Sequence, residues 1–116
     1  TATWITHETG HILNQRNGRL DDDFWDSLYY FTHNTNNPRG HDDSRCYING
    51  FIKTYGHCIY DCNVTASHES LAEAIALYVY NEKSNTTGTI NNFRNECPNT
   101  YAWIGDKVFN NYDFGN

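Results

Sequence analysis

Basic side chains, long apolar runs and closely spaced cysteine pairs are all scarce in this sequence of 116 residues. Eight Lys and Arg against 14 Asp and Glu give a net charge of −6. This balance argues against nucleic acid or an anionic membrane as a partner, because both select for basic patches. No apolar run approaches the roughly 20 residues that span a bilayer. No signal peptide is recognised, so we expect a mature or trimmed chain.

The four cysteines include no C-x-x-C pair, which argues against a zinc ribbon or a thioredoxin motif. They are Cys46, Cys58, Cys62 and Cys97. Two sequons begin at Asn63 and Asn85. An even cysteine count together with sequons favours an oxidising, secretory setting, with two disulfides and glycosylation. Three pairings of the four cysteines exist, and the spacing does not choose among them.

Two helices are predicted near the start of the chain, one over residues 4–16 and one from about residue 21. The first ends at Asn17-Gly18, because glycine suits the left-handed position that closes a helix. The second starts at Asp21–Asp23, whose carboxylates suit a helix N-terminus. We interpret these three as a solvated helix start rather than a calcium site. Phe24, Leu28 and Phe31 follow at helical spacing.

The remaining sequence predicts two further helices and little or no sheet. Residues 33–45 are predicted to form an exposed loop, and residues 46–66 to be irregular. The Ala-rich stretch 68–81 is typical of a helix capped by Ser67. A last helix is expected over about 99–111, with Asn99 as its cap. Its inward-facing residues are predicted to be Trp103, Ile104, Val108 and Phe109. The predicted fold class is therefore mainly α, in one domain over residues 1–116.

The stretch from His7 to His11 has the pattern H-E-x-x-H. In a helix, His7 and His11 lie four residues apart on one face and can turn two imidazole nitrogens to one metal ion. Glu8 can then act as a general base on a hydrolytic water without binding the metal. Gly10 predicts the close approach of another backbone or of a substrate, at a helix cost of about 1 kcal/mol relative to Ala. A catalytic zinc usually takes three protein ligands, so a third must come from elsewhere.

The third ligand is predicted on the 68–81 helix. The metzincin pattern would place it at residue 17, but that position and the preceding glycine position hold Asn17 and Asn14. Glu69 and Glu73 stand four apart on one helical face, so one can bind zinc while the other hydrogen-bonds a ligating His. His68 is expected in a loop or at a helix end, and it is a substitute ligand if Glu69 points away.

A solvated helix face is the alternative reading of Glu69 and Glu73. Against it, three small residues let this helix approach another one closely, so that a Glu face can be buried. They are Ala72, Ala74 and Ala76. A carboxylate buried in this way is stable when paired with zinc, and costs several kcal/mol without a partner.

The string ESLAEAIALY (69–78) resembles the E-x-x-A-E-A helix of the gluzincins related to anthrax lethal factor and the bacterial Pro-Pro endopeptidases. The segment FIKTYG (51–56) and the tail from Phe93 to Phe109 are similar to that family in the same order. The resemblance implies a helical zincin catalytic core in which His7, His11 and Glu69 bind Zn²⁺ and Glu73 lies behind them. It also implies a tyrosine that polarises the substrate carbonyl or stabilises the oxyanion. Tyr55 and Tyr60 compete for that role.

The implied function is that of a secreted zinc-dependent endopeptidase acting on a peptide or protein substrate. The family places a sheet before the first ligand helix, and its edge strand binds substrate by β-augmentation. Only six residues precede His7, so we expect this sheet to be absent, removed or supplied by a second chain. Two other classes stay open. One is a non-catalytic secreted effector or toxin-like interaction protein on the same scaffold, and the other is a disulfide-stapled binding module without metal.

Overall fold

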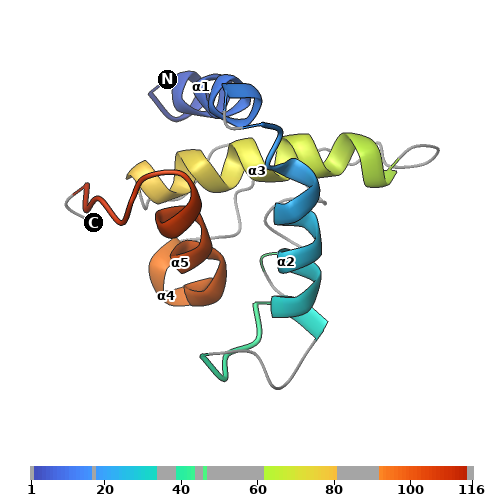
Figure 1. The fold of residues 1–116 in the computed structure, drawn as a ribbon. Helices are drawn as coiled ribbons and strands as arrows, with labels where there is room; N and C mark the ends of the chain where they lie inside the picture. Colours follow the sequence, from blue (N-terminus) through green and yellow to red (C-terminus); the bar gives the residue numbers. More distant parts are fainter. Residues whose placement is uncertain are drawn as a thin grey trace.

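The computed structural model describes residues 2–16, 18–33, 39–43, 46, 62–80 and 92–114. Within its helices, the side chains of residues 2–7, 62–67, 69 and 80 are not described. The helices are α1 (Ala2–Arg16), α2 (Asp21–His33), α3 (Cys62–Tyr80), α4 (Phe93–Glu96) and α5 (Pro98–Lys107). No strand occurs in these ranges (Figure 1). The predicted fold class, mainly α, is confirmed for the part of the chain that the structure describes.

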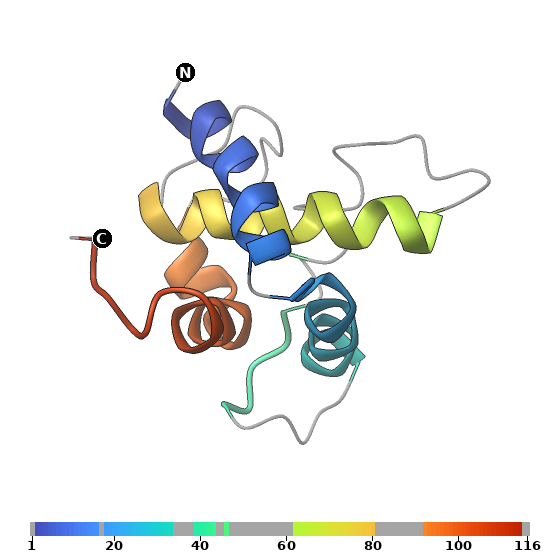
Figure 2. The same ribbon diagram turned by 45° about the horizontal axis from the view of Figure 1, so that its top comes forward.

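The α3 helix lies at the centre, and the other helices pack around it. In Figure 1, α1 lies on one side of α3 while α2, α4 and α5 lie on the other, and Figure 2 shows α1 passing over α3. The side chains of residues 70–78 are all buried. A helix that is covered on every side needs small or apolar residues all round, and the alternating Ala, Leu and Ile of α3 supply them.

Aromatic and aliphatic side chains from α2, α3 and α5 form the core. Phe24 and Leu28 of α2 and Ile104 of α5 are 1% exposed or less. The rings of Phe24 and Trp103 meet edge-on with their centroids 5.2 Å apart. The predicted inward positions Trp103 and Ile104 are thereby confirmed, while Val108 and Phe109 are half-buried against the core beyond the end of α5.

The end of α1 follows the prediction, whereas the start of α2 corrects it in one respect. Gly18 adopts φ +78°, the left-handed conformation that closes a helix, and the N–H of Arg19 donates to the carbonyl of Asn14 at 2.8 Å. Asp21–Asp23 do begin α2, and Asp22 and Asp23 are exposed. Asp21 is only 3% exposed, so its interpretation as part of a solvated helix start was wrong.

The α3 helix begins earlier than its sequence indicates. It starts at Cys62, so residues 62–66 are helical rather than irregular, and Ser67 lies inside the helix instead of capping it. His68 is likewise inside α3 and not at its end. Asn63, Val64 and Thr65 are weak helix formers, and propensity is only a weak guide to where a helix begins.

The predicted helix over 99–111 corresponds to α5 with different bounds, and the short helix α4 before it was not predicted. Cys97 occupies the N-cap of α5 and Pro98 its first position, where a missing N–H costs nothing, so Asn99 is not the cap. The helix ends at Lys107. Beyond it, Asn110 and Asn111 have φ of 52° and 62°, and the N–H of Asn111 donates to the carbonyl of Gly105 at 2.7 Å.

The segment that follows α2 (residues 39–43 and 46) is held more firmly than an exposed loop. Residues 39–42 are exposed as predicted, but Asp43 is fully buried. Three residues further on, Cys46 forms a disulfide with Cys97, with 6.2 Å between the two Cα atoms. One of the two expected disulfides is therefore present, and Cys58 lies outside the described residues. None of the described helices is long and apolar enough to cross a membrane.

Candidate functional site

The two motif-bearing helices, α1 and α3, touch backbone to backbone at Gly10. A Cβ atom placed on Gly10 would lie 2.9 Å from the Cα of Ala72 and 3.1 Å from its carbonyl oxygen. Real Cβ contacts are longer than this, so only glycine allows the observed approach. The expectation that Gly10 admits another backbone is confirmed, and the partner is the central alanine of the E-x-x-A-E-A string.

This contact sets the rotation of both helices about their axes. Each helical residue turns by about 100°, so His7 and His11 point about 40° apart, and Gly10 lies about 60° from His7 on the other side. By the same rule, Glu69 lies about 60° from Ala72 and about 40° from Glu73. On each helix, the predicted ligand positions therefore lie to one side of the residue that makes the contact, within about 100° of it. The side chains of His7 and Glu69 themselves lie outside the described residues.

Two described side chains of the H-E-x-x-H stretch differ in their exposure. His11 is half-buried and Glu8 is exposed. The exposed position of Glu8 gives its carboxylate access to solvent and to a substrate. A general base needs that access, since it must meet a water molecule and then a leaving group.

Glu73 is fully buried in α3, at 0% exposure. It takes part in at least one polar or electrostatic interaction. The solvated alternative is therefore wrong for Glu73, and the predicted burial of a Glu on this Ala-rich helix is confirmed at this position. A buried carboxylate is stable only with partners. The partners of Glu73 therefore hold its carboxylate in a fixed position beside the contact of α1 and α3.

A polar network that the sequence did not reveal joins α1, α2 and α3 next to this crossing. The side-chain amide of Asn14 donates to Asp21 Oδ1 at 3.0 Å, and the N–H of Asp21 donates back to Asn14 Oδ1 at 3.0 Å. Asp21 also receives the guanidinium of Arg19 at 3.1 Å, and its other oxygen lies 3.3 Å from His68 Nε2. Asn14 is one helical turn beyond His11, and His68 immediately precedes Glu69.

The charges of this network shift two pKa values. Burial by itself raises the pKa of Asp21, but the hydrogen bonds from Arg19, Asn14 and its own N–H, with the charge of His68, outweigh burial and lower it. The hydrogen bond to Asp21 and the charge of that carboxylate raise the pKa of Arg19. The Nη2 atom of Arg19 lies 2.6 Å from His68 Nε2. His68 is thus turned toward the start of α2.

Arg19 adopts φ 64°, a left-handed conformation that non-glycine residues rarely take. The hydrogen bonds of the network offset the cost of this backbone conformation, because the left-handed turn directs the guanidinium of Arg19 toward Asp21. Nothing in the local sequence marks Asn14, Arg19 or Asp21 as partners. The only signal available was that the first predicted helix ends in polar residues. The end of such a helix still needs a buried contact with a neighbouring segment.

Several predicted site residues lie outside the described part of the chain. Tyr55 and Tyr60, the two candidates for the catalytic tyrosine, fall there, as do the side chains of His7 and Glu69. Among the described residues, no group of three or more His, Cys, Asp or Glu side chains is placed to hold a metal ion. His7 and Glu69, two of the three predicted ligands, are not among these described side chains.

Comparison with known proteins returned no match to a family model, to a curated protein or to a solved structure. What bears on the function of this chain is therefore the crossing of α1 and α3 and the residues that flank it.

Proposed function

We propose that this chain is the helical catalytic core of a secreted zinc-dependent endopeptidase of the zincin type. The observation that carries the proposal is the contact between Gly10 and Ala72. It brings the H-E-x-x-H stretch and the E-x-x-A-E-A stretch, some 60 residues apart in sequence, against each other at the middle of both motifs. The Cys46–Cys97 disulfide supports a secretory setting.

His7, His11 and Glu69 are the residues that would hold zinc. Two imidazoles and one glutamate are a donor set that catalytic zinc takes, with one position left open. The contact of α1 and α3 at Gly10 supports this assignment, because each helix carries its predicted ligands within about one turn of that contact. When bound, zinc would polarise the substrate carbonyl and make the attacking water more acidic.

The remaining chemistry belongs to side chains of this chain. Glu8 accepts a proton from the attacking water and passes it to the leaving amine, which its exposed position permits. Tyr55 or Tyr60 donates a hydrogen bond to the developing oxyanion. Glu73, buried one turn from Glu69, accepts a hydrogen bond from a ligating His and fixes its orientation.

The decisive experiment combines metal analysis with cleavage of a broad-specificity quenched peptide library. We expect the purified chain to hold one zinc and to cleave peptides, and Glu8→Gln to keep the zinc while losing about 10²–10⁴-fold in rate. Asp26→Asn is the matched control, because it removes one exposed carboxylate on α2 and leaves α1 intact. Cleavage by Glu8→Gln at the wild-type rate contradicts the role of Glu8.

The ligand assignment has its own test. His11→Ala and Glu69→Ala should each lose zinc, whereas His33→Ala, which removes an exposed histidine at the end of α2, should keep it. Zinc binding by the wild type without cleavage of any peptide would favour the non-catalytic interaction protein. A melting temperature that chelators leave unchanged, with no zinc in the native protein, would favour the disulfide-stapled binding module.

A further inference from the structure

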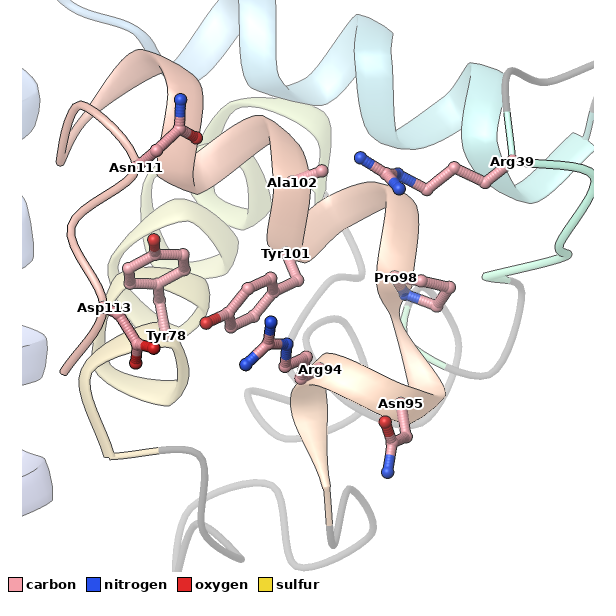
Figure 3. Close-up of a pocket in the computed structure, with 9 residues that line it drawn as sticks. All are labelled: Arg39, Tyr78, Arg94, Asn95, Pro98, Tyr101, Ala102, Asn111 and Asp113. Atoms are coloured by element: carbon pink, nitrogen blue, oxygen red, sulfur yellow. The ribbon is translucent and has the colours of Figure 1, made fainter. Parts of the chain in front are cut away.

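A cavity of about 480 Å³ opens on the side of α3 that faces away from α1 (Figure 3). Its walls come from the segment after α2, from α3, α4 and α5, and from the tail after α5. None of its described lining residues belongs to α1. The cavity is therefore separate from the proposed metal centre, although its size is that of a small-molecule site.

Two of the eight basic side chains of this acidic protein line the cavity. Arg39 comes from the segment after α2 and Arg94 from α4, and both side chains are exposed. Figure 3 shows the guanidinium group of Arg94 beside the ring of the α5 residue Tyr101, and that of Arg39 near Ala102 of the same helix. Asp113 is the one carboxylate among the described lining residues. These residues therefore have a net positive charge, although the whole chain has a net charge of −6.

Arg94 is held against an aromatic wall. Its guanidinium carbon lies 5.4 Å from the centroid of the Tyr101 ring, and Tyr101 stacks on Tyr78 with 4.5 Å between their centroids. The hydroxyl of Tyr78 donates to the carbonyl of Tyr112 at 2.8 Å. Burial, together with Tyr101 and Asp113, raises the pKa of Tyr78, so this wall adds no negative charge near neutral pH. A guanidinium braced in this way loses little freedom when it binds a ligand.

The space around Arg39 continues beyond this cavity. A second cavity of about 310 Å³ shares Arg39, Ala102 and Asn111 with the first and runs along the other side of α5. The side-chain amides of Asn95 and Asn111 add uncharged hydrogen-bonding groups to the walls. A ligand of several atoms can thus extend along α5 past Arg39, with its charged end in the first cavity, because Asp106 lines the second.

We propose that this cavity binds a small organic anion whose charged group is a carboxylate or a phosphate. A guanidinium matches either group because its planar N–H donors pair with two oxygens at once. The proposal does not depend on zinc. It concerns a different face of α3, and the anion is recognised by Arg39 and Arg94.

Isothermal titration calorimetry of the full chain at low ionic strength tests the proposal. The carboxylate probes are succinate and glutarate, the phosphate probes are inorganic phosphate and glycerol 3-phosphate, and succinamide is the uncharged control. We expect at least one class of anion to bind, with an affinity that falls as salt is added, and succinamide not to bind. Binding by only one class identifies the charged group, and binding by both supports the shared chemistry.

Arg39→Gln and Arg94→Gln should each weaken the binding about tenfold or more, the loss of one charged hydrogen-bonding partner. Lys107→Gln removes the same charge from the exposed end of α5, outside the lining, and should leave the affinity unchanged. If circular dichroism shows that Arg94→Gln does not fold, the affinity measured for Arg39→Gln decides the test. Equal affinity in Arg39→Gln and Lys107→Gln, or no binding of any anion to the wild type, overturns the proposal. Repeating the titration with and without zinc should give the same result.

Discussion

Two parts of this small protein bury an aspartate at the start of a helix, and they hold it in different ways. The first is the α1–α3 crossing, with Gly10 and Ala72 in contact and Asp21 beside them. The second is the α5 corner, which we define as Asp43, Asn99, Thr100 and the Cys46–Cys97 disulfide. Both bring distant segments together, but only the first adjoins the residues proposed to do chemistry.

The α5 corner is held together by hydrogen bonds from backbone and side-chain donors, by a histidine and by a covalent bond. Asp43 accepts hydrogen bonds from the backbone N–H of Thr100 at 2.9 Å, from its hydroxyl at 2.7 Å and from the amide of Asn99 at 3.1 Å. His41 lies 3.2 Å from the same carboxylate, and the disulfide follows three residues later. Asp43 thus caps the N-terminus of α5 from outside the helix.

The α1–α3 crossing depends instead on the absence of a side chain and on charged neighbours. Nothing covalent joins the described parts of α1 and α3 there, and the approach is set by Gly10. Asp21 relies on the guanidinium of Arg19 and on the ring of His68. The two regions therefore differ in what holds them together. The proposed catalytic region depends on the close packing of two helices, whereas the α5 corner has a disulfide and a hydrogen-bonded aspartate that resist unfolding.

Removal of the disulfide should have the largest effect on stability. Cys46 and Cys97 are 51 residues apart, and freeing a loop of this length in the unfolded chain costs about 4 kcal/mol of unfolding free energy. We expect that loss for the double variant Cys46→Ala/Cys97→Ala in urea denaturation, with zinc content unchanged in the protein that remains folded. A loss of zinc in the folded fraction would show that the two regions are coupled.

Asp43→Ala should have the second largest effect on stability. We expect the free energy of unfolding to fall by about 2–4 kcal/mol, because the variant leaves several buried donors around α5 without an acceptor. Asp42→Ala removes a neighbouring but exposed carboxylate and should change stability by no more than about 0.5 kcal/mol. Equal effects of the two variants in urea denaturation would contradict the account of the α5 corner.

Gly10→Ala should cost about 1–3 kcal/mol through overpacking against Ala72, even though alanine is the better helix former. The exposed neighbour gives the control, since Thr9→Ala should be neutral or slightly stabilising. Zinc affinity is the second readout. It should fall in Gly10→Ala and stay constant in Thr9→Ala, whereas a merely global loss of stability would leave zinc binding to the folded protein intact.

Local patterns predicted the helices, the cap at Gly18 and the close approach at Gly10, because each of these depends on residues near in sequence. Burial of Glu73 followed from the alanines around it. The polar contacts could not be predicted: Asp43 binds Thr100 across 57 residues, and Asp21 meets His68 across α2 and α3. A carboxylate of this kind looks like any solvated acid until the packing of the helices is known. The start of α3 was missed because propensity is only a weak guide to where a helix begins.

The smallest predicted effect is a change in how stability depends on acidic pH, and it distinguishes Asp21 from its exposed neighbours. Because the folded state lowers the pKa of Asp21 below its ordinary value of 3.8, this group stabilises the fold above that value. The stabilisation is lost as pH falls through the lowered folded-state pKa, when the carboxylate takes up a proton. We expect the unfolding free energy of the wild type to decline across this acid range more steeply than that of Asp21→Asn. Asp23→Asn, on the exposed face of the same helical turn, should keep the wild-type slope, and an identical slope in Asp21→Asn would contradict the ionised network around Asp21.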